Sequence, residues 1–369
     1  MNRCALAAFC GVAGISLSAF GQVPNNTFST IPQTLTDTYK VTNFGEEVTW
    51  GDEFDGTGEV DTSKWSSVYE TYRRAGYNDI NNQTAVNNGS LKITTSPRST
   101  AGASAGYFPT AMVGTQQNQY FKYGYFETSV KLQSAVGNWT AFWLQSAKID
   151  TKASTPNPKA NGMEVDIYEN TIKSAGAGKV NSAIHYNSYE AGYHQQDLEL
   201  SYANQYEKSN NTTGDGTDKF GLLWTPTFMA FYTNDKLAWV VKESGTSVGV
   251  SGGTAGVDYD LSNATWGVSQ IPLYMILSSE VANAATSDLG WGGDPSKGIL
   301  GQGQSDIFSV DYVRYYSAGI AGAQSGSAQD FGIAIPSYKT YGVNSAVPEP
   351  TAAFAALGAG LGLLRRRRR

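Results

Sequence analysis

The stretch Gly162-Met163-Glu164-Val165-Asp166-Ile167-Tyr168-Glu169-Asn170 places three carboxylates among apolar residues. Successive side chains of a β-strand point to opposite faces, so this pattern predicts a strand with acids on one face and core residues on the other. Carboxylates side by side repel and raise each other's pKa, so a purely structural strand would not be expected to align them. The three acids therefore favour a functional role for this strand. An edge strand with a solvated acidic face is the alternative explanation of this segment alone.

The spacing of the acids points to a particular chemistry. Glu164 and Asp166 share a face, whereas Glu169 is five residues from Glu164 and would point away in a regular strand. One β-bulge near Ile167 and Tyr168 would turn Glu169 back to the acidic face. The two glutamate Cα atoms would then be roughly 13 Å apart, and inward-reaching side chains would leave roughly 5 Å between the carboxylates. Glycosidases that retain anomeric configuration need about that gap, because inverting enzymes need roughly 6.5–9.5 Å to admit a water.

The remainder of the chain favours β-structure. The whole chain holds 41 glycines, 22 tyrosines and 8 tryptophans with only 16% charged residues, a composition that suits strands and turns. Apolar and polar residues alternate in 123–132, in 228–232 before an Asn234-Asp235 turn, and in 308–316. Many short strands with frequent turns predict an antiparallel sandwich or barrel.

Glu164 to Glu169 resembles the bulged Glu-X-Asp-X-X-Glu signature of glycoside hydrolase family 16. Other segments are similar to that family in the same order: 50–56, 61–65, 121–127, 137–144, 223–226 and 310–316. The resemblance implies an all-β, concanavalin-like jelly-roll sandwich with an open concave cleft. It also implies that Glu164 is the nucleophile and Glu169 the acid/base, with Asp166 orienting Glu164 and keeping Glu169 protonated.

Other residues are expected to line the cleft. Trp139 and Trp143 are four residues apart and therefore face the same side of a strand, where we expect sugar platforms, with core packing as the alternative for one of them. His185 is placed like a cleft histidine on a strand beside the signature, or else is a satisfied core histidine. Glu280 and Trp291 are expected on the far wall.

Both ends of the chain carry predicted targeting segments. Residues 1–21 have a basic start, an apolar run and small residues before a cleavage point, which is typical of a secretory signal peptide. At the other end, residues 347–369 contain Val347-Pro348-Glu349-Pro350, the thirteen apolar or small residues 352–364 and five arginines. This order resembles the PEP-CTERM sorting signal. It implies transient contact with the inner membrane and a final place outside the cell, or on the surface, of a Gram-negative bacterium.

The sequence between these segments is expected to form one catalytic domain, 41–318, flanked by linkers at 22–40 and 319–346, and to act as a monomer. Without Arg3 and the five terminal arginines, 20 basic residues face 32 acidic ones, a balance of about −12 that excludes a general nucleic-acid binder. Both cysteines lie in the signal segment and only two histidines exist, which excludes disulfides and a His/Cys zinc site. No organic cofactor is required. The resemblance implies a structural calcium in many members, for which Asp311 is the candidate ligand.

The substrate class is open at this stage. The predicted substrate is a β-linked polysaccharide, and a body this acidic favours a neutral β-1,3- or mixed-linkage glucan of the laminarin type. The alternative is a red-algal galactan such as agar, porphyran or carrageenan. Arg73, with its neighbour Arg74, forms the one arginine pair of the mature body and would then receive sulfate. A carbohydrate-binding module and a surface structural protein are the non-enzymatic alternatives, and neither explains three aligned acids.

Overall fold

The computed structural model describes residue 28 and residues 30–68, 71–149, 158–174, 178–186, 194–198, 216–242, 268–286 and 292–335. The predicted signal peptide, the predicted sorting signal and Trp291 all lie outside these residues. In the described part of the chain, no helix is long and apolar enough to cross a membrane.

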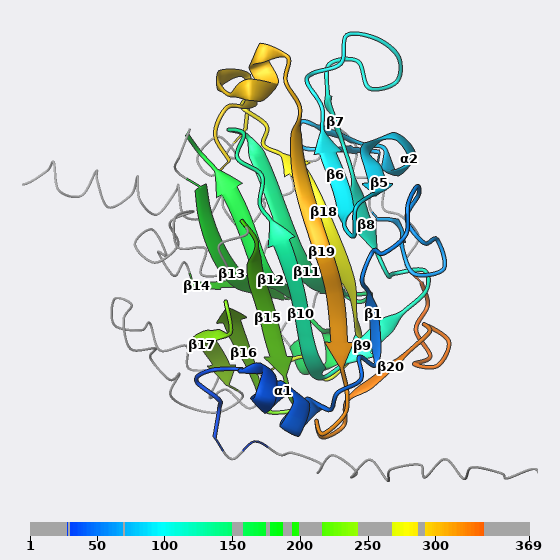
Figure 1. Cartoon of the computed structure of the whole chain (residues 1–369), viewed down its shortest axis with the longest axis vertical. Coiled ribbons are helices and arrows are strands. Elements are labelled where there is room, and N and C mark those ends of the chain that lie inside the picture. The colour runs from blue at the N-terminus through cyan, green and yellow to red at the C-terminus, as the bar shows by residue number, and fades with distance from the viewer. Residues whose placement is uncertain are drawn as a thin grey trace, which may run out of the picture.

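Two antiparallel sheets stacked face to face form the body (Figure 1). The first, called here the back sheet, has the order β17-β16-β15-β10-β19-β6-β5, with β1 on β19. Its strands are β1 (Trp50–Asp52), β5 (Thr84–Val86), β6 (Leu91–Thr95), β10 (Gly124–Lys131), β15 (Asp218–Trp224), β16 (Phe228–Thr233), β17 (Lys236–Lys242) and β19 (Asp306–Tyr316).

The second sheet, called here the site sheet, has the order β14-β13-β12-β11-β18-β8-β2, extended by β9 on β18 and β20 on β9. Its strands are β2 (Ser66–Ser67), β8 (Met112–Gly114), β9 (Tyr120–Lys122), β11 (Asn138–Ser146), β12 (Glu164–Ile172), β13 (Gly178–Tyr186), β14 (His194–Leu198), β18 (Leu273–Val281) and β20 (Gln324–Gly326). The predicted all-β sandwich is therefore confirmed.

Small elements complete the described chain. A three-stranded sheet is formed by β3 (Tyr72–Arg73), β4 (Gly76–Asn78) and β7 (Phe108–Thr110). The helices are short: α1 (Asp37–Phe44), α2 (Ile80–Gln83), α3 (Pro158–Asn161) and two 3₁₀ turns, Pro295–Lys297 and Ile299–Gln302.

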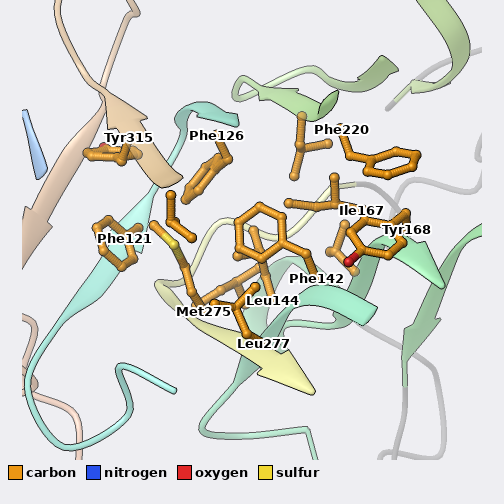
Figure 2. Packing of buried hydrophobic residues seen from close by; sticks show 14 of the residues in the cluster. Phe121, Phe126, Phe142, Leu144, Ile167, Tyr168, Phe220, Met275, Leu277 and Tyr315 are labelled. Atoms are coloured by element: carbon orange, nitrogen blue, oxygen red, sulfur yellow. The ribbon is translucent and has the colours of Figure 1, made fainter. Parts of the chain in front are cut away.

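The main core lies between the two sheets. Figure 2 shows Phe142, Leu144 and Ile167 of the site sheet pointing toward Phe126 and Phe220 of the back sheet. Because side chains alternate along a strand, burying these residues leaves the intervening positions of β11 and β12 on the opposite face. That face of the site sheet carries the acids of the 162–170 stretch.

The alternating segments form strands as expected. Residues 123–132 contain β10, 228–232 lie within β16, and 308–316 lie within β19. Asn234 and Asp235 connect β16 to β17 with φ values of 49° and 65°. Two consecutive residues with positive φ define a type I′ hairpin, the turn whose twist matches that of the flanking strands.

The folded body extends beyond the predicted limits of 41 and 318. In the predicted 22–40 linker, Leu35 is fully buried and Lys40, in α1, forms an ion pair with Glu127 of the back sheet. In the predicted 319–346 linker, β20 joins the site sheet, and Ala328 packs with Trp143 and Tyr274. The linker prediction is wrong for 30–40 and 319–335, because scattered apolar residues in a polar or small-residue background were enough to anchor both segments.

Candidate active site

Strand β12 contains the predicted bulge. Against β11, Phe142 pairs with Tyr168 and Trp143 pairs with Asp166, so Ile167 is an extra residue between them. Against β13, the register shifts in the same place, between Asp166 and Glu169. Ile167 and Tyr168 are both in the core between the sheets. The bulge thus allows Glu169 to share the face of Glu164 and Asp166.

Asp166 and Glu164 lie around a buried histidine. His185 Nε2 on β13 is 2.9 Å from Asp166 Oδ2 and 3.9 Å from Glu164 Oε1. His185 is 2% exposed and is the cross-strand partner of Glu164. His185 thus lies on the strand next to the signature strand, and its ring bridges the nucleophile candidate and its neighbouring aspartate.

Glu164 is held from the other side by β11. The amide Nε2 of Gln145 donates to Glu164 Oε2 at 2.8 Å, and the hydroxyl of Tyr274 donates to Gln145 Oε1 at 2.5 Å. Gln145 is the cross-strand partner of Glu164 on one side and of Tyr274, in β18, on the other. The hydroxyl fixes the orientation of the amide, because the amide oxygen must face Tyr274 and its NH₂ group must then face the carboxylate.

Glu169 has a different environment. Trp139 Nε1 donates to Glu169 Oε1 at 2.8 Å, and Asn181 Nδ2 donates to Glu169 Oε2 at 3.1 Å. Burial raises the pKa of the Glu169 carboxyl above its ordinary value and outweighs the opposing influence of His185, the Trp139 hydrogen bond and Arg74. A carboxyl group that keeps its proton at higher pH is suited to general acid catalysis.

Two arginines meet Glu280 at the same end of the site. Arg73 Nε and Arg74 Nε both donate to Glu280 Oε2, at 2.8 and 2.6 Å. Although burial raises the pKa of Glu280, the two guanidinium groups hold that pKa below its ordinary value. Glu280 is the cross-strand partner of Trp139, so it lies beside the acid/base candidate rather than on a distant wall.

Arg74 occupies an unusual backbone conformation. It begins the two-residue loop between β3 and β4 with φ of 53°, a region that costs a residue with a Cβ of the order of 1–3 kcal/mol. The loop is tied to the site sheet, because Ala75 N donates to Val281 O at 3.0 Å. The Arg74 guanidinium carbon lies 4.0 Å from the ring centroid of Trp139.

The tryptophans do not offer open sugar platforms. Trp143 is 3% exposed, packs with Tyr274 and Ile276, and donates from Nε1 to Ser278 Oγ at 3.1 Å. The platform prediction for Trp143 is therefore wrong, because the segment after β20 covers that part of the sheet and makes the residue part of a core. Trp139 is 4% exposed, with Arg74 stacked on its ring.

Asp311 does not form a calcium site with other described acids. Its side chain is exposed on β19, and the one group of three metal-type ligands found in the described residues is Glu164, Asp166 and His185, on the other sheet. Calcium also takes backbone carbonyl oxygens and waters as ligands, so a calcium ion at Asp311 stays a prediction.

Sequence reasoning did not assign Gln145, Asn181 or Tyr274 to the site. Gln145 has one signal that could have found it, because it follows Trp139 and Trp143 at even spacing and so must share their face. Tyr274 had none, because its role depends on β18 pairing with β11 from more than a hundred residues away.

Comparison with known proteins agrees with this architecture. The sequence profile of the family described as "Beta-porphyranase A-D, GH16 domain" matches residues 47–318. The keratan-sulfate endo-1,4-beta-galactosidase of Sphingobacterium multivorum is 22% identical over 277 residues, which are 73% of this chain and 55% of that protein. The chain thus spans about half the length of that curated relative.

Among solved structures, the catalytic domain of an endo-1,3-beta-glucanase (laminarinase) from Thermotoga petrophila has a TM-score of 0.51 and 19% identity, covering 74% of this chain and 98% of that one. This likeness concerns the fold, and it confirms the jelly-roll sandwich. Because the family profile matches most of the chain, the protein belongs to glycoside hydrolase family 16, in the group of the β-porphyranase A–D domains.

Proposed function

We propose that this protein is an endo-acting glycoside hydrolase that cleaves a β-linked galactan with retention, using Glu164 as the nucleophile and Glu169 as the general acid and base. The observation that carries this proposal is the bulge in β12, which allows the side chains of both glutamates to lie on the same face of the site sheet. Their surroundings differ as the two roles require, since burial raises the pKa of Glu169 while Glu164 accepts a hydrogen bond from Gln145.

The chemistry follows a double displacement. Glu169 donates its proton to the glycosidic oxygen as Glu164 attacks the anomeric carbon, which breaks the glycosidic bond and forms a covalent glycosyl-enzyme. Glu169, now ionised, takes a proton from a water molecule as the water oxygen attacks the anomeric carbon, and the bond between the sugar and Glu164 breaks. Asp166, hydrogen bonded to His185, orients the nucleophile from the neighbouring position.

A sulfated galactan of the red-algal type is the substrate class best supported. The matching family is described as β-porphyranase, and the curated relative is named for cleavage of keratan sulfate at a β-galactosidic bond. In the site itself, the two positive charges of Arg73 and Arg74 exceed the single negative charge of Glu280, to which both arginines are bound. The side chain of Arg73 is 22% exposed, so part of it is accessible to a sulfate group while Glu280 holds the Nε of its guanidinium.

A neutral β-1,3-glucan is the second candidate. It is favoured by the charge of the mature body, about −12, which repels a polyanion outside the immediate surroundings of Arg73. The two candidates differ in what Arg73 does, because a neutral glucan has no group that requires a guanidinium.

A substrate panel tests the function. Purified protein is incubated with porphyran, agarose, carrageenan, laminarin and lichenan, and new reducing ends are measured. We expect porphyran to be shortened into oligosaccharides and laminarin to remain intact, with Glu164→Ser inactive yet still retained by the same polysaccharide in affinity electrophoresis. Cleavage of laminarin alone would favour the second candidate, and binding without cleavage of any polysaccharide would favour a carbohydrate-binding module.

The remaining expectations are part of the proposal. We infer export through residues 1–21 and release or surface retention through residues 347–369, and a monomer that needs no organic cofactor. Fractionation of cells that express the full chain, compared with a chain ending at residue 346, tests whether the tail directs the protein to the membrane before release.

A further inference from the structure

Arg73 and Arg74 are adjacent in sequence and bind the same carboxylate oxygen, but their side chains have different exposures. The Arg73 side chain is 22% exposed, whereas the Arg74 side chain is 5% exposed. Arg74 is therefore withdrawn from solvent and from an incoming polysaccharide. Its contacts are with protein groups: Glu280 on β18 and the ring of Trp139 on β11.

Those contacts lead to the acid/base. The guanidinium of Arg74 lies over the indole of Trp139 at 4.0 Å from the ring centroid, and the indole N–H donates to Glu169 Oε1 at 2.8 Å. A planar guanidinium on an aromatic face is an attractive contact that restricts the ring to one plane. Since the N–H direction is fixed by that plane, the position of Arg74 determines where the Glu169 carboxyl is held.

The backbone supports the same assignment. Arg74 has a positive φ that glycine would adopt without strain, and the first position of a two-residue hairpin loop is a common place for glycine. An arginine at this position is explained by what its side chain contacts. The hydrogen bond from Ala75 N to Val281 O aligns the loop with the strand that carries Glu280.

We propose that Arg74 is a positioning residue for catalysis, which clamps the indole of Trp139 and thereby fixes the Glu169 carboxyl at the glycosidic oxygen. The inference rests on the proposed function, because it gives Glu169 the acid/base role. It assigns separate tasks to the two arginines: Arg73 contacts substrate, and Arg74 acts through Trp139.

The sign of the pH effect follows from the groups around Glu169. These are His185 from β13, Asp166 from β12, Glu280 from β18 and the two arginines from the β3–β4 hairpin. Arg74 and the Trp139 hydrogen bond both lower the pKa of Glu169, and Glu280 raises it. Removing the Arg74 charge or the indole N–H therefore raises that pKa, and the alkaline limb of kcat/KM, which reports the loss of the acid's proton, moves to higher pH.

Arg74→Met is the main test, measured on whichever polysaccharide the wild-type enzyme cleaves. We expect kcat to fall roughly 10- to 100-fold with KM changed less than about twofold, and the alkaline limb to move to higher pH. Arg98→Met is the matched control, because Arg98 also stacks on an aromatic ring, Phe108 at 4.7 Å, but lies on an exposed loop. Its kcat and both pH limbs should equal those of the wild type.

Two further variants separate positioning from other roles. Trp139→Phe keeps a ring under the guanidinium but lacks the N–H, and should reproduce the upward shift of the alkaline limb. Arg74→Lys keeps the positive charge but lacks the planar guanidinium, so it should restore the alkaline limb of kcat/KM more than it restores kcat. This variant also replaces Arg74→Met as the test if Arg74→Met melts at a much lower temperature than the wild type.

The inference is overturned if Arg74→Met has the kcat and the alkaline limb of the wild type. It is also overturned if only KM rises, because Arg74 would then be a substrate contact. A wild-type enzyme that cleaves no polysaccharide would instead contradict the proposed function itself.

Discussion

Glu127 in the back sheet and Glu169 in the site sheet are both withdrawn from solvent, but their partners differ. Glu127 is 3% exposed, forms an ion pair with Lys40 of α1, and accepts hydrogen bonds from Tyr125 at 2.7 Å and Tyr312 at 2.8 Å. Glu169 is half-buried and is held by two neutral donors, the indole of Trp139 and the amide of Asn181.

Under the proposed function, the difference separates a structural acid from a reactive one. A buried ammonium compensates the charge of Glu127, and Glu127 in turn helps to raise the pKa of Lys40 above its ordinary value despite burial. Glu169 instead accepts hydrogen bonds from the neutral groups of Trp139 and Asn181, and burial raises its pKa. The first arrangement pairs a carboxylate with a buried ammonium and attaches α1 to the sheet; the second favours a carboxyl group that keeps its proton.

The largest effect should come from substitution of the reactive acid. Glu169→Gln cannot donate a proton, so we expect kcat to fall by about 10²–10⁴ on natural polysaccharide, measured by release of reducing ends. Glu127→Gln is the matched change in the back sheet and should retain kcat within about twofold at temperatures where it remains folded. Loss of activity in both variants would remove the distinction between the two acids.

Stability should show the reverse order. Glu127→Leu leaves the ammonium of Lys40 uncompensated by its nearest partner, although Asp235 Oδ1 remains at 2.8 Å. Breaking a buried ion pair costs about 3–5 kcal/mol, which we expect as the loss in free energy of unfolding by urea titration. The free energy of unfolding of Glu169→Gln should differ from that of the wild type by less than about 1 kcal/mol in the same assay. Equal losses would show that Glu169 is also a structural acid.

Smaller effects are expected from the support of the nucleophile. Tyr274→Phe removes the hydroxyl that orients the Gln145 amide, so the amide can present its oxygen to Glu164 instead of its NH₂ group. We expect kcat to fall about tenfold through misplacement of the nucleophile, with the melting temperature little changed. Ser278→Ala, which removes the acceptor of Trp143 on the same strand, should leave kcat within about twofold. A larger loss in Ser278→Ala than in Tyr274→Phe would contradict this role of Gln145.

The smallest effect concerns the pH dependence of stability. The folded chain holds the Glu169 proton to higher pH than the unfolded chain, where the ordinary value is 4.5. The folded state therefore binds more protons above that pH, and stability falls as pH rises from about 4.5 through the folded pKa. Glutamine does not titrate, so Glu169→Gln should match the wild type at pH 4 and melt about 1–2 °C higher at pH 8. A Glu169→Gln variant that is less stable than the wild type at pH 8, but equal to it at pH 4, would contradict the predicted direction of this effect.

Much of the fold could be predicted from the sequence, because the signals were local. Alternation located β10, β16 and β19, and the odd spacing between Glu164 and Glu169 required a bulge where Ile167 now lies. The ends of the domain were misjudged because Leu35 and Ala328 belong to a few scattered apolar residues in segments of linker composition. Their burial depends on surfaces that only the assembled sheets create.

The site was predictable only in part, for a related reason. The position of His185 beside Glu164 followed from the expected strand neighbours, and the structure places its ring against Asp166. The burial of Trp143 and the stacking of Arg74 on Trp139 depend on segments that cross the sheet from distant parts of the chain. Side-chain spacing along one strand contains no information about such crossings.

The stereochemistry of the first product tests most directly whether Glu164 and Glu169 act together on one glycosidic bond. Proton NMR of a short incubation follows the anomeric signal of each newly formed reducing end before mutarotation. A double displacement through Glu164 predicts that the β-anomer appears first and the α-anomer grows in later. An α-anomer that appears first would mean direct attack by water, and would contradict the assignment of Glu164 as the nucleophile.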